Sequence, residues 1–265
     1  ESLSNRDVGT CILSISDLHI PFQKPIETFS EYAGKIDILQ VNGDLVDAQA
    51  ISRFNKVYRK SPMEEILIAR QYMIDLIEML QPKKVVINYG NHDLRFQNYL
   101  AKNLDTDLLE LMPKTSLELI FVDGFNHYNK ELHTKVHYDP LIDVFKDSGI
   151  EIVYNDTWFS FVGETIFVHP LAYSSGMLKT AEKAYRYFKD NDYFFDNIVM
   201  AHTHKTGHYD IGNSVIYEQG CCCETSKMDY ADGKLTPSQR EGFILVYQDK
   251  FGRLNEDKTR IVRLN

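Results

Sequence analysis

Several short apolar runs rich in β-branched residues end abruptly at carboxylate, amide and imidazole side chains. Residues 10–16, 35–41 and 83–88 are the first three such runs, and each has the length and composition of a buried strand. The polar side chains that follow the three runs include Asp17, Asp44 and Asn91, respectively. This recurrence predicts a sheet with polar chemistry gathered where its strands end.

A helix and further strands complete an α/β pattern. Residues 62–80 carry apolar side chains at intervals of three and four, which predicts an amphipathic helix with Ser61 as its N-cap and Pro62 in its first turn. A strand, a helix and a strand in this order predict parallel pairing with a right-handed crossover. Further strands are expected over 151–154, 157–162, 165–168, 197–201, 205–217 and 242–248, and a further helix over 175–189.

The length and composition fit one compact domain over residues 1–265. Apolar residues make up 43% of the chain and charged residues 25%, as in ordinary globular proteins. Residues 94–146, whose pattern is mostly helical and polar, are expected to form a helical cap or elaboration of this domain. No apolar run approaches the roughly 20 residues of a membrane span, so no membrane partner is expected. Because the chain begins with Glu1 rather than methionine, a missing upstream segment is compatible with it.

The cysteines indicate the redox environment of the protein, and the net charge bears on its binding to nucleic acid. Cys11 and the consecutive Cys221, Cys222 and Cys223 lack the spacing of a disulfide framework, and also the two-residue gaps of zinc sites. We expect buried or strand-end thiols and a reducing, cytoplasmic location. The net charge of −9 disfavours a strong nonspecific grip on nucleic acid. Bound divalent cations would locally reverse the field around an acidic site.

Five local motifs carry the candidate metal ligands. If the chain is extended at an Asp-x-His or His-x-His pair, both side chains point to the same side. Ligands at the carboxyl ends of neighbouring strands converge in space, and two metals bridged by one carboxylate need about seven protein ligands. The chain supplies that number, in the order Asp17, His19, Asp44, Asn91, His169, His202 and His204.

Chance explains these motifs poorly when they are taken together. Each motif alone is common, but here all of them follow a predicted strand. Mixed oxygen and nitrogen ligands suit manganese, iron, zinc or nickel better than a pure oxygen site for calcium or magnesium would. The remaining histidines lack this setting and are expected at the surface or in packing; they are His127, His133, His137 and His208.

The ordered motifs resemble those of the calcineurin-like metallophosphoesterase superfamily, over residues 11–248. The resemblance implies an α/β fold, a four-layer α/β/β/α sandwich with two mixed sheets flanked by helices. It also implies two divalent metal ions, manganese first, with iron, zinc, nickel or magnesium as alternatives. In this family pattern the first ion is held by Asp17, His19 and His204, and the second by Asn91, His169 and His202. Asp44 bridges both.

The resemblance also implies catalytic roles. A water or hydroxide between the two ions would attack phosphorus in line. His92 would stabilise the transition state or protonate the leaving oxygen, and Asp47 would orient His92. Arg53 and Arg95 are candidates for binding the substrate phosphate, with solvated salt bridges as the alternative for each.

Three functions are compatible with these residues. The first is a phosphodiesterase or nuclease acting on DNA, RNA or a nucleotide, as in the stand-alone phosphoesterases of bacteria and phages that residues 90–100 resemble. The second is a phosphomonoesterase, although Ala48 and Asp93 differ from the Arg and Glu of the Ser/Thr protein phosphatases. The third is a non-catalytic metal-binding module, which the complete set of ligands disfavours. Nothing in the sequence specifies an oligomeric state.

Overall fold

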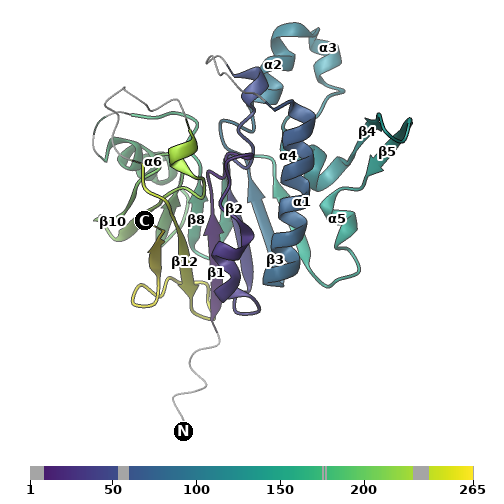
Figure 1. The fold of residues 1–265 in the computed structure, drawn as a ribbon. Coiled ribbons are helices and arrows are strands. Elements are labelled where there is room, and N and C mark those ends of the chain that lie inside the picture. Colours follow the sequence, from purple (N-terminus) through teal and green to yellow (C-terminus); the bar gives the residue numbers. More distant parts are fainter. Residues whose placement is uncertain (1–8, 53–59, 175, 177, 229–238, 265) are drawn as a thin grey trace.

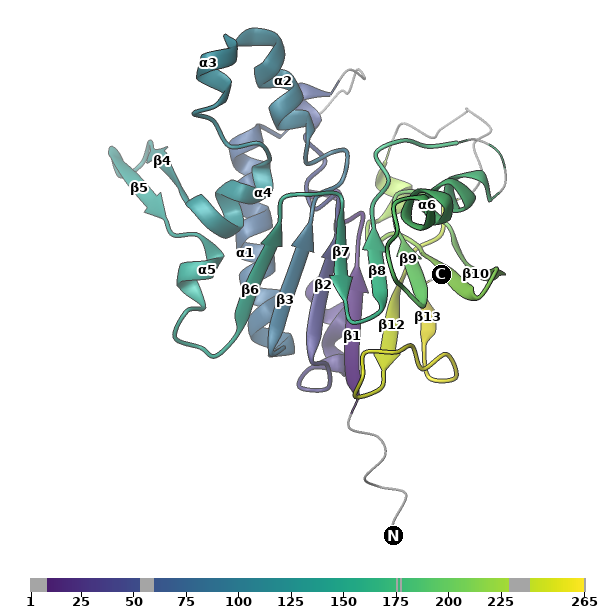
Figure 2. The same ribbon diagram turned by 180° about the vertical axis from the view of Figure 1, so that it is seen from behind.

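Two β-sheets packed face to face form the centre of the molecule. The computed structural model describes residues 9–52, 60–174, 176, 178–228 and 239–264. Helices cover the outer face of each sheet, which gives the four layers α/β/β/α (Figures 1 and 2). The fold class expected from the sequence is therefore confirmed. Among the described residues, none of the helices has the length and apolar character needed to cross a membrane.

The first sheet has six strands in the order β13-β12-β1-β2-β3-β6. Four neighbouring strands of this sheet, β1, β2, β3 and β6, are mutually parallel, as the strand–helix–strand pattern predicted. The strand β12 is antiparallel to both β1 and β13. The bounds are β1 Thr10–Ile15, β2 Ile38–Asn42, β3 Lys84–Asn88, β6 Glu151–Asn155, β12 Gly242–Gln248 and β13 Arg260–Arg263.

The second sheet has five strands in the order β10-β11-β9-β8-β7. The strand β9 lies parallel to both β8 and β11, and the outer pairs β7–β8 and β10–β11 are antiparallel. The bounds are β7 Phe159–Val162, β8 Thr165–Val168, β9 Asn197–Met200, β10 Thr206–Ile211 and β11 Ser214–Gln219. In both sheets the parallel strands carry their carboxyl ends at the same edge, where the polar motifs begin.

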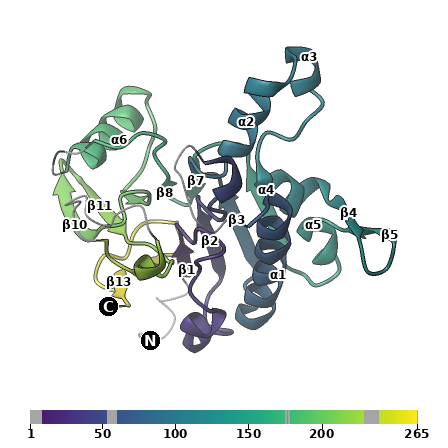
Figure 3. The same cartoon turned by 45° about the horizontal axis from the view of Figure 1, so that its top comes forward.

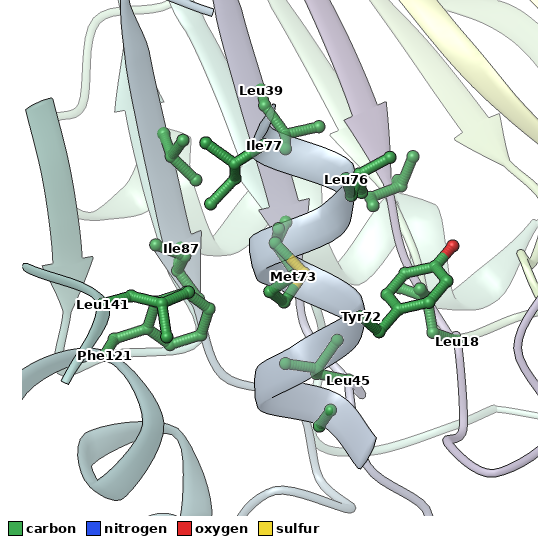
Figure 4. Packing of buried hydrophobic residues seen from close by; sticks show 14 of the residues in the cluster. Leu18, Leu39, Leu45, Tyr72, Met73, Leu76, Ile77, Ile87, Phe121 and Leu141 are labelled. Atoms are coloured by element: carbon green, nitrogen blue, oxygen red, sulfur yellow. The ribbon is translucent and has the colours of Figure 1, made fainter. Parts of the chain in front are cut away.

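Three apolar clusters hold the layers together. The largest lies between the first sheet and the helix α1 (Pro62–Leu80), where Met73, Leu76 and Ile77 point toward the strands (Figure 4). A second cluster, with Phe167 and Ile244, fills the space between the sheets. The third packs the helix α6 (Lys179–Asp190) against the second sheet. Burial of apolar surface on both faces of each sheet is the main stabilising contribution in such a sandwich.

Residues 94–146 are less helical than the sequence suggested. They form short helices and turns and the two-stranded sheet of β4 (Phe125–Asn129) and β5 (Thr134–Tyr138), which stands at the side of the molecule (Figure 2). The helix α2 (Arg95–Asn103) and the turn α3 (Thr106–Leu109) project from the top (Figure 3). The rest packs on α1 and the first sheet: α4 Ser116–Glu118, the π-helical turn η4 Leu119–Asp123 and α5 Leu141–Val144. The role of this segment as a cap remains a prediction.

Three short 3₁₀ helices complete the described elements. They are η2 (Ile26–Tyr32), η3 (Gln49–Ile51) and η5 (Thr225–Lys227). The η2 turn packs on α1 beside the first sheet, through Phe29 and Tyr32. The η3 turn directly follows the loop that carries Asp47, so its position influences the site described next.

Candidate metal centre

The predicted ligands that end different strands lie together at the shared edge of the two sheets. Asp17 and Asp44 follow β1 and β2, and Asn91 follows β3. His169 follows β8, while His202 and His204 follow β9. The buried side chain of Asn42 joins the two sheets directly beneath this point. Its Nδ2 donates to the carbonyl oxygens of Val168 and Val199, at 3.2 and 3.3 Å.

Asp17, His19 and His204 form the first group of candidate ligands. The Nε2 atoms of the two histidines face each other at 3.2 Å. Asp17 Oδ1 lies 3.2 Å from His204 Nε2 and 3.7 Å from His19 Nε2. All three potential ligand atoms are within 4.8 Å of one another, so they converge on one point.

Asp44, His169 and His202 form the second group, again with ligand atoms within 4.8 Å of one another. His169 Nε2 lies 3.2 Å from Asp44 Oδ2. Asn91 belongs beside this group, because its Oδ1 lies 3.3 Å from the same nitrogen of His169. Asp44 also approaches the first group, with Oδ2 at 3.9 Å from His19 Nε2. It therefore stands between the two groups.

This arrangement fits a pair of divalent cations. Ligand atoms that bind one ion at about 2.1 Å lie roughly 3.0–3.4 Å apart in tetrahedral or octahedral geometry. The 3.2 Å separations within both groups match that spacing. Asp17 and Asp44 are also almost completely buried, and buried carboxylates require compensating positive charge.

The backbone at the ligand positions is not extended. This differs from the sequence-based expectation, in which extended chain at the Asp-x-His and His-x-His pairs would point both side chains to the same side. Asp17, His19 and Asp44 have φ values of 49°, 45° and 54°, and His202 and His204 have values of 76° and 52°. All five lie in the left-handed region, which is uncommon for residues other than glycine. The chain turns back at each strand end, and the side chains converge because of these turns rather than because of strand alternation.

His92 and Asp47 lie next to the first group. Asp47 Oδ1 is 3.2 Å from His92 Nδ1 and 3.2 Å from His19 Nδ1. The carboxylate therefore lies against two imidazoles, one more than expected, and the carbonyl oxygen of Asp47 lies 3.0 Å from His92 Nδ1. Arg95 donates to the carbonyl oxygen of Asp47 at 2.9 Å and lies 3.1 Å from His92 Nε2. Because a guanidinium only donates, His92 Nε2 accepts and Nδ1 carries the proton.

The two predicted phosphate-binding arginines have different outcomes. The guanidinium of Arg95 is at the centre, in contact with His92. Arg53 lies outside the described residues. The other histidines do not join the centre: His133, His137 and His208 are exposed and His127 is half-buried, as predicted.

Further residues, not predicted from the sequence, hold the candidate ligands in place. His169 Nδ1 donates to the carbonyl oxygen of Asn42 at 2.8 Å, and His204 Nδ1 lies 2.8 Å from Gln239 Oε1. Buried Asp93 accepts from the backbone N–H groups of Asp44 and Gly90, both at 2.8 Å. Asn42 directly precedes the Gly43-Asp44 motif, and Asp93 is the last residue of the motif that starts at Gly90. These positions could have indicated a role for both residues. Nothing local marks Gln239.

Burial and the neighbouring charges shift the pKa values of several side chains in the centre. Burial alone would lower the pKa of His19 and of His169, but the carboxylates around them raise both to about 9. Burial and the neighbouring His169 lower the pKa of His202 to about 4. Burial beside the carboxylate of Asp44 raises the pKa of Asp93 to about 7. Without bound cations, protons on His19 and His169 would supply the positive charge that the buried carboxylates require.

The model of the calcineurin-like phosphoesterase family matches residues 12–206 of the chain. The chain belongs to this family. It is accordingly a metal-dependent phosphoric ester hydrolase.

The chain is also similar to solved structures, including the following three. An archaeal phosphodiesterase is 14% identical, covering 96% of this chain and 99% of its own, with a TM-score of 0.44. A metallophosphoesterase from Sphaerobacter thermophilus is 13% identical, covering 97% of this chain and 88% of its own, with a TM-score of 0.43. Vps29 from Entamoeba histolytica, complexed with Zn²⁺, is 14% identical, covering 96% and 99%, with a TM-score of 0.40. Among curated proteins, none matches the chain.

Proposed function

We propose that this calcineurin-like phosphoesterase hydrolyses phosphodiesters of nucleic acid or nucleotides with two divalent cations. The observation that carries the proposal is the position of Asp44 between two convergent groups of ligand atoms. The first cation is assigned to Asp17, His19 and His204, and the second to Asn91, His169 and His202, with Asp44 shared. We assign manganese first, because the carboxylate and amide oxygens of the mixed set suit it, and the imidazoles make iron, zinc and nickel alternatives, with magnesium as a further one.

When bound, two such cations lower the pKa of a water molecule and neutralise the phosphoryl oxygens. The chain itself supplies the orientation of the ligands. Asn42 and Gln239 hold the Nδ1 atoms of His169 and His204, so the Nε2 atom of each ring is turned toward the centre. Such secondary contacts fix ring orientation and tautomer.

His92 and Arg95 are assigned to the substrate and its leaving group. Arg95 now donates toward His92 Nε2, and a phosphate oxygen is a stronger acceptor for a guanidinium than a neutral imidazole is. Substrate binding would therefore draw Arg95 onto the phosphate and release His92 Nε2. Asp47, whose carboxylate lies 3.2 Å from Nδ1 and whose carbonyl oxygen lies 3.0 Å from it, would then stabilise the protonated ring that donates to the leaving oxygen.

An aromatic residue beside the centre supports a nucleotide-type substrate. The ring of Tyr173 is 6.1 Å from that of His202, and 46% of the residue is exposed. Lys205 Nζ lies 5.8 Å from the centre of the Tyr173 ring. An exposed aromatic ring next to a lysine can stack on a base and bind an adjoining phosphate. These contacts favour a diester with a base near the scissile bond.

The test compares substrates and one substitution. The manganese-loaded protein is expected to cleave bis-p-nitrophenyl phosphate faster than p-nitrophenyl phosphate, and to cleave labelled single-stranded DNA or RNA. The substitution Asp44→Asn should lower kcat/KM by about 10³-fold or more, because it removes the shared ligand. The matched control Asp143→Asn changes an exposed carboxyl on α5 and should leave kcat/KM unchanged. Turnover of the monoester alone would contradict the diesterase assignment. Binding of two metals without any turnover would favour a binding module.

A further inference from the structure

The three consecutive cysteines have no part in the proposed reaction, yet two of them lie against the metal centre. Cys221, Cys222 and Cys223 directly follow β11 and Gly220, and all three are fully buried. The thiols are free. As expected from the sequence, they are inside the molecule, but their two sides differ.

Backbone hydrogen bonds hold this segment beneath the start of the site. The N–H of Cys222 donates to the carbonyl oxygen of Ser16 at 2.9 Å, and its own carbonyl oxygen accepts from Lys24 at 2.9 Å. The N–H of Cys221 donates to the carbonyl oxygen of Arg240 at 3.0 Å, and the N–H of Arg240 donates to that of His204 at 2.8 Å. The segment is thus tied to the chain on both sides of the first ligand group.

Side chains alternate along the segment, as they do in extended chain. Cys222 enters the large cluster between α1 and the first sheet. Cys221 and Cys223 enter a separate small cluster with Met228. The two outer thiols therefore face the same side.

Three possible ligand atoms meet on that side. One atom each from His204, Cys221 and Cys223 lie within 4.8 Å of one another. The sulfur of Met228 lies 3.3 Å from the sulfur of Cys223 and adds a soft thioether. His204 is the member in contact with solvent, with its side chain 11% exposed. Two thiolates, an imidazole and a thioether suit thiophilic cations, whereas carboxylates and carbonyls suit manganese and magnesium.

We propose that His204, Cys221 and Cys223 form a separate binding site for one thiophilic cation of the zinc, cadmium or copper(I) class. His204 is shared, because it also belongs to the group with Asp17 and His19. A cation held by the two sulfurs competes for this imidazole and disturbs the first ligand group. Occupation of the thiol site therefore inhibits the enzyme. This consequence, unlike the binding itself, rests on the proposed function.

Cadmium binding to the manganese-loaded protein tests the site directly. Cadmium bound to thiolate absorbs in the ultraviolet, and cadmium bound only to carboxylate and imidazole lacks that band. One equivalent of thiolate-bound Cd²⁺ per chain is expected in the unsubstituted protein. The combined substitutions Cys221→Ser and Cys223→Ser should remove the band. The control Cys11→Ser, which changes a half-buried thiol at the start of β1, should retain it.

Turnover gives the second readout. In the unsubstituted protein, Cd²⁺ should inhibit bis-p-nitrophenyl phosphate cleavage in step with growth of the band. The concentration for half-inhibition should rise at least about tenfold in the double variant and stay the same in Cys11→Ser.

The outcomes separate the two proposals. Absence of the band in the unsubstituted protein, or its persistence in the folded double variant, overturns the thiol site whatever the turnover. A thiolate band without any basal turnover leaves the site intact and contradicts the proposed function. A band together with unchanged turnover overturns the inhibitory coupling. If thermal unfolding shows that the double variant does not fold, the single substitution Cys223→Ser replaces it, and loss of at least half of the band intensity is expected.

Discussion

At the scale of single residues, the metal centre depends on the absence of two side chains. A Cβ atom at Gly90 would lie 2.2 Å from Asp44 Oδ1, and one at Gly43 would lie 2.5 Å from His169 Nδ1. Gly43 also has a φ of +79°, a conformation that glycine adopts without steric penalty. Both glycines therefore admit a buried ligand side chain into space that a larger residue would occupy.

The substitution Gly90→Ala tests this packing. The added methyl group would displace Asp44 from its position between the two ligand groups, so we expect kcat/KM to fall by about 10²-fold or more, with weaker manganese binding. The free energy of unfolding should also fall by about 1–3 kcal/mol, because the added methyl group overpacks the core there. The measurements are turnover, metal titration and thermal unfolding.

Gly207 is the matched control on β10. A Cβ atom there would have no heavy atom within 4 Å outside Gly207 and its two chain neighbours, so Gly207→Ala should change kcat/KM less than twofold. Equal losses in the two variants would mean that the effect of Gly90→Ala does not come from contact with Asp44.

At the scale of elements, α1 connects the core to the loop of Asp47. The helix begins with a capping box in which Ser61 and Glu64 exchange hydrogen bonds between side chain and backbone. One residue later, buried Glu65 accepts from the backbone N–H of Ala48 at 2.8 Å and of Gln49 at 3.0 Å. The helix thus fixes the residues next to Asp47, at the start of η3.

Adjacent substitutions in α1 separate these two roles. Glu65→Ala removes a charged acceptor from two buried N–H groups, so it should destabilise the protein by about 2–4 kcal/mol and lower kcat at least about tenfold by loosening Asp47. Glu64→Ala removes only an exposed cap interaction, so it should cost about 0.5–1 kcal/mol of stability and leave kcat unchanged. Thermal unfolding and steady-state kinetics distinguish the variants. An unchanged kcat in Glu65→Ala would disprove the link from α1 to Asp47.

The elements differ in how well their sequences predict them. The bounds of α1 were predicted in full, because its cap and its apolar spacing are both local signals. The strands β4, β5 and β13 were not predicted. Their short sequences mix polar, charged and apolar residues without a regular alternation, and only Phe125 among them is buried. Their pairing partners make them strands. The helix predicted over 175–189 is described from Lys179 to Asp190.

At the scale of the whole molecule, protons and cations compete to balance the buried charge between the sheets. Without bound metal, the pKa values of His19 and His169 are raised from the ordinary 6.5 to about 9. A raised histidine pKa stabilises the folded state below the unfolded pKa, and this contribution is lost as the pH rises through the folded value. The metal-free protein should therefore lose stability between about pH 6.5 and 9.

Thermal unfolding with chelator and with manganese tests this balance. In chelator the Tm should fall by several degrees from about pH 6.5 to 9. With manganese the Tm should be higher and should not fall over that interval, because deprotonated imidazoles bind the cation more tightly. A Tm in chelator that rises over the same interval would contradict protonated histidines in the metal-free centre.

The kinds of candidate ligands, their order and their positions after strands could be predicted from the sequence alone, because these signals are local to a few residues each. The sequence also determined the parallel core through the strand–helix–strand pattern. Which ligand atoms meet, in contrast, depends on how the two sheets pack. His169 stands alone in the sequence, and Gln239 reaches His204 from 35 positions away. Left-handed turns, rather than extended chain, aim Asp17 and His19 at the centre. Such convergence depends on the packing of two sheets, which sums contacts from the whole chain, so no single segment encodes it.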